Sequence, residues 1–129
     1  DRKKTKRYLS VERRDNMNES ILTSIKKLLG ITEDYEHFDQ DIIAHINAAL
    51  MIVTQLGVGP EQGYIVTDKN ATWGDFVNSE TNVAALISYV YIKVKLMFDP
   101  PQNSFTIDSL NRQASEFEWR LNAAVDYKD

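Results

Sequence analysis

The residues whose types and spacing come closest to a chemical site are His37, Asp41 and His45, which recur at every fourth position. Side chains four residues apart share one face of a helix, and two imidazoles with a carboxylate could bind zinc. His37, however, is expected to precede the helix, and no further ligand or general base follows in register. We therefore interpret the two histidines as surface and boundary residues and expect no metal site.

The rest of the sequence carries no recognisable catalytic motif. The chain has no cysteine, which excludes disulfides, thiolate ligands and a cysteine nucleophile. Glu116 and Glu118 lie two positions apart, so they point away from each other on a helix and make a poor acid and base pair. A glycine-rich phosphate loop, a nucleophile elbow and a metalloprotease motif are all missing. We expect no catalytic residues, no cofactor and no enzymatic activity.

The charge of the chain is unevenly divided. Residues 1–16 hold seven Lys or Arg and three Asp or Glu, whereas residues 17–129 hold eight and sixteen. A basic arm can bind nucleic acid or an acidic protein surface, but chain ends are more often solvated and poorly ordered. We favour the solvated arm for residues 1–16. Residues 17–129 are then one helical domain, large enough to bury a core.

The two ends of the chain carry further signals. Met17 stands just ahead of the first convincing helix, so the natural product could begin there, and the final four residues match the start of a common epitope tag. The opening residues lack the apolar core of a secretion signal. The longest uncharged run, residues 42–60, contains a histidine, amides and glycines, which favours a buried helix over a membrane span. We expect a cytoplasmic protein.

Helical periodicity runs through the domain outside residues 57–79. It predicts an all-α fold, a small bundle of about four helices with one long loop. The expected helices cover residues 18–29, 39–56, 80–98 and 104–124.

Local signals mark the helix ends. Asn18 and Asp39 can cap the first two helices, and Gly30 suits a left-handed C-cap. The sequence Asp-Pro-Pro at residues 99–101 ends the third helix, because each proline lacks an amide donor and pushes its predecessor out of the helical region. After this corner the last helix can pack back or project outward, and the pattern leaves both open.

Single positions within the helices give further expectations. Met51 and Ile52 make the second helix apolar on more than one side, so this helix is either central in the domain or half of an interface. Met97 continues the core stripe of the third helix. On the last helix, Arg112 and Glu116 are spaced to form an ion pair.

The loop of residues 57–79 is rich in turn-forming residues. The pattern of side chains around residues 64–66 alternates briefly, as in a β-strand, so a short β-hairpin is possible there. Thr72 and Asp75 have the spacing of a capping box, which predicts a short helical turn containing Trp73 and Phe76. Both aromatic side chains are large, and something must cover them.

The overall pattern resembles the small helical head-tail connector, or adaptor, proteins of long-tailed bacteriophages. The resemblance covers residues 18–122 and leaves out residues 1–16. It is a likeness of the whole chain, since that family has no catalytic motif to match. It rests on the segments "ESILTSIKKLLGI", "DIIAHINAALMIVTQLGVGP", "TDKNATWGDF", "YIKVKLMFDPP" and "LNRQASEFEWRLN".

This resemblance implies a structural virion protein at the head-tail junction, assembled in the host cytoplasm. A ring of copies, expected to be dodecameric, would dock under the portal protein, extend the DNA channel and carry a tail-side stopper or tail-completion protein. DNA would pass through without specific binding, and no membrane would be involved. The long helices would pack side by side between subunits, with the last helix free to engage a neighbour or the portal.

Aromatic side chains are the candidate interface residues of such a ring. They are Trp73, Phe76, Tyr89, Tyr91 and Trp119. Aromatic residues at helical spacing more often serve packing or an interface than ligand binding. We expect the loop with Trp73 and Phe76 to be ordered mainly by other subunits, the portal or the tail component.

The principal alternative is a small helical nucleic-acid-binding regulator that uses the basic arm of residues 1–16. Its weakness is the acidic helical body, because domains that bind nucleic acid usually carry a basic surface. A small enzyme with an unrecognised site ranks below both.

Overall fold

The computed structural model describes residues 16–77 and 83–125, and the named elements in these ranges are all helices. Within the same ranges the β-structure is limited to one isolated antiparallel bridge, between Ser20 and Thr72. The all-α prediction is therefore confirmed. The helices are α2 (Ile21–Leu29), α3 (Asp39–Gln55), α4 (Trp73–Phe76), α5 (Val83–Phe98) and α6 (Ser104–Val125).

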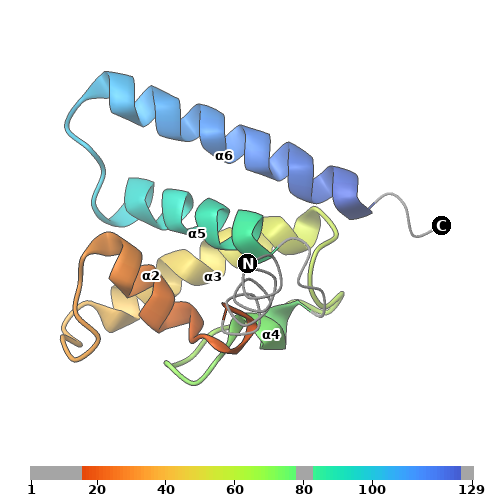
Figure 1. Ribbon diagram of the computed structural model, residues 1–129, viewed down its shortest axis with the longest axis horizontal. Coiled ribbons are helices and arrows are strands. Elements are labelled where there is room, and N and C mark those ends of the chain that lie inside the picture. Colours follow the sequence, from red (N-terminus) through yellow and green to blue (C-terminus); the bar gives the residue numbers. More distant parts are fainter. Residues whose placement is uncertain (1–15, 78–82, 126–129) are drawn as a thin grey trace, which may run out of the picture.

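Helix α5 lies in the middle of the fold, between α3 on one side and α6 on the other (Figure 1). The contact between α3 and α5 is the most extensive, the contact between α5 and α6 comes next, and α2 packs on both α3 and α5. The core forms where these helices meet the short α4. Its largest fully buried side chains are Ile21, Ile25, Ile42, Ile46, Leu50, Trp73, Leu86, Tyr89 and Leu121.

Helix α2 ends at Leu29, as predicted, but its N-cap is Ser20 and not Asn18, so the helix begins two residues later than predicted. Gly30 takes the left-handed conformation (φ 82°) as the C-cap. At the other end Ser20 is the N-cap, and its hydroxyl accepts the Thr23 amide at 3.2 Å. The backbone of Ser20 is extended because it pairs with Thr72, so the helix cannot start before it.

Helix α3 begins at Asp39 as predicted, but Asp39 does not cap it. Phe38 occupies the N-cap position without a side-chain hydrogen bond. The Asp39 carboxylate instead pairs with the buried Lys26 ammonium at 2.8 Å. The charge of that lysine decides where the carboxylate points, which a local capping rule cannot anticipate.

The loop between α3 and α5 confirms one local prediction and not the other. Thr72 and Asp75 form the expected capping box at the start of α4. The hairpin near residues 64–66 does not form, because both backbone groups of Val66 bind the side chain of Asn47. The Val66 amide donates to Asn47 Oδ1 (2.8 Å), and Asn47 Nδ2 donates to the Val66 carbonyl (3.0 Å).

The Asp-Pro-Pro corner turns the chain back, so that α6 runs antiparallel along α5 (Figure 1). Asn103 restarts the helix, because its side-chain oxygen accepts the Phe105 amide at 2.8 Å. Helix α5 is described from Val83, and residues 80–82 of the predicted helix lie outside the described residues. Met97 was expected in the core but is 41% exposed, whereas Tyr89 and Ile92 are buried because α5 is covered on two sides.

Candidate functional site

The five aromatic residues suggested as interface side chains fall into two groups. Trp73, Phe76 and Tyr89 are buried within the single chain, with exposed fractions of 0, 2 and 0%. Tyr91 is partly buried, and Trp119 is 71% exposed. Only Tyr91 and Trp119 therefore present surface that another molecule could contact.

Trp73 is held by the chain's own helix α2. Its indole Nε1 donates to the Ser24 hydroxyl at 2.8 Å, and its backbone amide donates to the Glu19 carbonyl at 3.2 Å. Phe76 packs against Gly59, where an added Cβ would come within 2.6 Å of the phenyl ring. The chain's own core thus covers the two side chains that sequence reasoning assigned to other subunits. Ser24 lies 49 residues from Trp73, too far for a local pattern to link them.

Tyr89 brings a polar atom into the contact between α5 and α6. Its hydroxyl is buried and has no hydrogen-bond partner within the described residues. Burial first, and then the nearby Glu118 carboxylate of α6, raises the pKa of Tyr89 well above its ordinary value of 10.0. The phenol therefore stays protonated to higher pH than an ordinary tyrosine, and it serves packing.

The histidine row belongs to an aromatic cluster. The His37 ring packs edge-on against Phe38, with centroids 4.7 Å apart, and the His45 ring stacks on Phe98 at 6.4 Å. Across residues 16–77 and 83–125, no group of His, Asp or Glu is arranged to hold a metal ion. The two histidines therefore pack, directly or through Phe38, against Phe98 at the end of α5.

Lys26 is a buried cation that sequence reasoning did not single out. It is 2% exposed, and its ammonium donates to the carbonyls of Glu33 (3.0 Å) and Tyr35 (2.7 Å) and pairs with Asp39. Two of the three N–H donors of this ammonium are thus bound to carbonyls, and the Asp39 carboxylate balances its charge as an ion pair. Lys26, which belongs to α2, thus links this helix to the following loop and to the first residue of α3.

Helix α6 uses little of its surface in the core. Only Ala114 and Leu121 are buried among its residues. On the opposite face Phe105, Arg112 and Trp119 recur every seven residues and form what we call the outer face of α6. Phe105 is 83% exposed and Trp119 is 71% exposed. Trp and Phe are enriched at protein interfaces, so this face is a candidate contact surface.

The charges on this helix differ from the prediction. Glu116 pairs with Arg120 at 2.6 Å, four residues onward, and not with Arg112, four residues back. An acidic residue N-terminal to a basic one at this spacing is the better orientation in a helix. Arg112 is exposed, and no ion pair joins it to another described residue.

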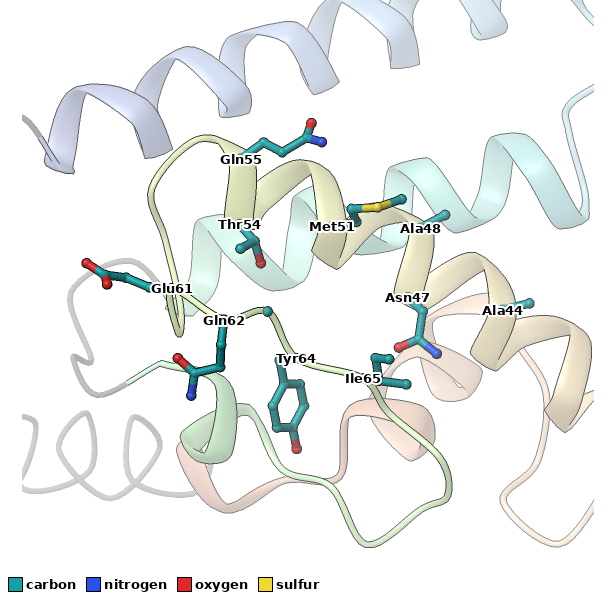
Figure 2. A pocket seen from close by; sticks show the side chains of 11 residues that line it. Ala44, Asn47, Ala48, Met51, Thr54, Gln55, Glu61, Gln62, Tyr64 and Ile65 are labelled. Atoms are coloured by element: carbon teal, nitrogen blue, oxygen red, sulfur yellow. The ribbon is translucent and has the colours of Figure 1, made fainter.

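A second unpartnered surface lies between α3 and the loop that follows it (Figure 2). We call it the α3 groove. It has a volume of about 870 Å³, and its exposed apolar side chains Met51 and Ile65 are 59 and 72% exposed. Glu61 lies at the end of the groove away from Ala44. The groove is lined by Ala44, Asn47, Ala48, Met51, Thr54, Gln55, Glu61, Gln62, Gly63, Tyr64 and Ile65.

Residues 21–128 match the model of a family described as phage connector protein. This range begins with α2 and includes every named helix of the structure. No curated protein and no solved structure matches the chain. Separately, no helix in the described part of the chain is long and apolar enough to cross a membrane.

Proposed function

We propose, from the premise that this chain belongs to the phage connector protein family, that it forms a ring between the portal and the tail-side components of a virion. The ring, which we expect to be dodecameric, extends the channel through which the DNA passes. Its partners are further copies of the chain, the portal protein and a tail-side stopper or tail-completion protein. The chain acts as a structural part of the particle and carries out no reaction.

The observation that carries this proposal is the exposed aromatic surface of α6. A helix that only completed the core of a monomer would bury its large apolar residues, yet Phe105 and Trp119 are mostly exposed. The α3 groove adds a second apolar surface elsewhere on the chain. Two different unpartnered surfaces on one chain suit a subunit that has a neighbour on each side.

The test is the assembly state of the purified protein, alone and mixed with the portal protein of the same phage. Native mass spectrometry gives the number of copies, and negative-stain electron microscopy shows their arrangement. We expect closed rings in at least one of the two samples, and portal-bound rings in the mixture. A chain that stays monomeric in both samples would contradict the proposal.

The alternative, a nucleic-acid-binding regulator, has less support. The basic arm on which it depends lies almost wholly outside the described residues. The described residues hold seven Lys or Arg against thirteen Asp or Glu. Phosphate groups are bound by surfaces with the opposite balance.

A further inference from the structure

We propose that the outer face of α6 of one copy binds in the α3 groove of the next copy. The inference rests on the proposed function and assigns the two surfaces that form the ring contact. Trp119 enters the apolar part of the groove beside Met51 and Ile65, and Arg112 pairs with Glu61.

The dimensions of the two surfaces agree. The α3 groove runs along α3 from Ala44 to Gln55, a length of about 16 Å or three helical turns. Its volume of about 870 Å³ exceeds that of any single side chain, so it can take one face of a helix. The side chains of Ala44 and Ala48 are small, so the backbone of a second helix can approach α3 closely at these positions.

The chemistry of the two surfaces is complementary. Met51 offers a flexible thioether, which packs well on an aromatic ring such as that of Trp119. Arg112 lies seven residues from Trp119, or about 10 Å along the helix. Glu61 lies at the end of the groove away from Ala44 (Figure 2). Trp and Arg are also the residue types that most often dominate interface energies.

A contact between the outer faces of two α6 helices is less favourable. Arg112 lies midway between Phe105 and Trp119. In an antiparallel pair that matched Phe105 to Trp119, Arg112 would therefore face its own copy, and two like charges repel. Such a self-contact would also give dimers and leave the α3 groove empty. A contact between two different surfaces can repeat around a closed ring.

Two single substitutions test the pairing, each on one surface. Trp119→Ser removes the aromatic anchor from α6 but keeps the groove, and Met51→Glu places a charge in the groove but keeps α6. Both positions are exposed, so the monomer should fold normally, which circular dichroism checks. Met97→Ser, at another exposed apolar position, is the control. We expect both variants to lose the ring and the control to retain it, by native mass spectrometry.

Mixing the two variants distinguishes a contact between α6 and the α3 groove from a contact between two α6 helices. In an equimolar mixture, the intact α6 of the Met51→Glu chain can bind the intact groove of the Trp119→Ser chain. We expect one-to-one heterodimers that do not grow into rings, because the remaining two surfaces are both damaged. If α6 contacted α6 instead, Met51→Glu alone would still pair and the mixture would give no new heterodimer, which would overturn the inference.

Charge reversal tests the Arg112 contact by itself. Arg112→Glu and Glu61→Arg should each weaken ring assembly by about tenfold, and the double variant should recover most of the loss. No recovery would mean that the two side chains do not meet. If the Trp119→Ser and Met51→Glu variants both keep the ring, this inference fails while the proposed function stands. A wild-type chain that stays monomeric with and without the portal would overturn both.

Discussion

Buried polar atoms at three positions show how single residues stabilise this small helical domain. The Lys26 ammonium and the Trp73 indole have partners, and these partners come from distant parts of the chain. The Tyr89 hydroxyl has none within the described residues. A satisfied buried group is costly to remove because its partners lose their bonds, whereas an unsatisfied one can be removed at little cost. The two cases lead to opposite expectations.

Lys26→Met should lower the free energy of unfolding by about 3 kcal/mol. The substitution keeps an apolar chain of similar length but leaves the Glu33 and Tyr35 carbonyls without a donor and Asp39 without its counter-ion. Urea denaturation measures the loss. Lys27→Met is the matched control, because Lys27 is the exposed neighbour in the same helix. Equal effects of the two substitutions would show that the buried contacts of Lys26 contribute nothing.

Tyr89→Phe should leave the stability at neutral pH unchanged or raise it by up to about 1 kcal/mol, because only an unpaired hydroxyl is lost. The variant should also resist alkali better. The pKa of Tyr89 is raised on folding, so its protonated form stabilises the fold below the ordinary pKa of 10.0, and this stability is lost as the pH rises above that value. Urea denaturation near neutral pH and above the ordinary tyrosine pKa tests both statements. A wild-type protein and a variant that lose stability equally in alkali would disprove the second.

The elements differ in how much of their surface the core uses. Helices α3 and α5 each bury six residues, whereas α6 buries two and is tied at its far end by Asn122, whose side-chain amide donates to the Leu56 carbonyl at 3.2 Å. The loop beside the α3 groove is joined to that helix by the two hydrogen bonds between Asn47 and Val66. Loss of these bonds should let the loop move while the helices stay packed.

Asn47→Ala should loosen the loop and lower the free energy of unfolding by about 1 to 2 kcal/mol, because both backbone groups of Val66 lose their partner. Hydrogen exchange of the Val66 amide should become faster, while exchange in the centre of α5 should change only as far as global stability changes. Asn70→Ala, at an exposed position in the same loop, serves as the control. Slow exchange of the Val66 amide in the variant would show that the loop is held by other contacts.

At the scale of the whole molecule, charge is the property that bears most on the passage of DNA. Residues 17–129 hold eight Lys or Arg and sixteen Asp or Glu. Copies arranged in a ring would multiply this negative field around the channel, and phosphates would meet few cations that could hold them. In the proposed ring, this field would favour sliding of the DNA over binding.

Deletion of residues 1–15 should leave helicity and ring formation unchanged, and duplex DNA should bind weakly to the full-length and shortened proteins at near-physiological salt. The cut is placed before Asn16, whose carbonyl accepts the Glu19 amide at 3.3 Å. Circular dichroism, native mass spectrometry and fluorescence anisotropy with a labelled duplex measure these properties. Tight DNA binding that disappears with the arm would favour the nucleic-acid regulator.

Features that depend on neighbouring residues could be predicted before the fold was known. The left-handed Gly30 and the capping box of Thr72 follow from chain geometry within one helical turn, and the structure agrees with both. Helix α3 also begins at Asp39 as predicted, although Asp39 does not cap it. The all-α class and the resemblance to phage connectors also came from pattern alone, as did the surplus apolar position Met51 that now lines the α3 groove. These signals are local or periodic, so they can be recognised in the sequence without knowledge of the fold.

Contacts between groups that are distant in the sequence depend on how the helices pack, and local patterns do not predict them. The Asp-Pro-Pro corner required the helix to stop, but the packing of α6 back along α5 depends on side chains from both helices. Ser24 as the partner of Trp73, and Asn47 as the partner of Val66, lie 49 and 19 residues away along the chain. Trp119 is among the candidate interface residues predicted from the sequence. That Phe105 and Arg112 share an exposed face with it follows only from the packing of the opposite face of α6 on α5. Burial is a property of the assembled fold, because each helix can present any of its faces until its neighbours are in place.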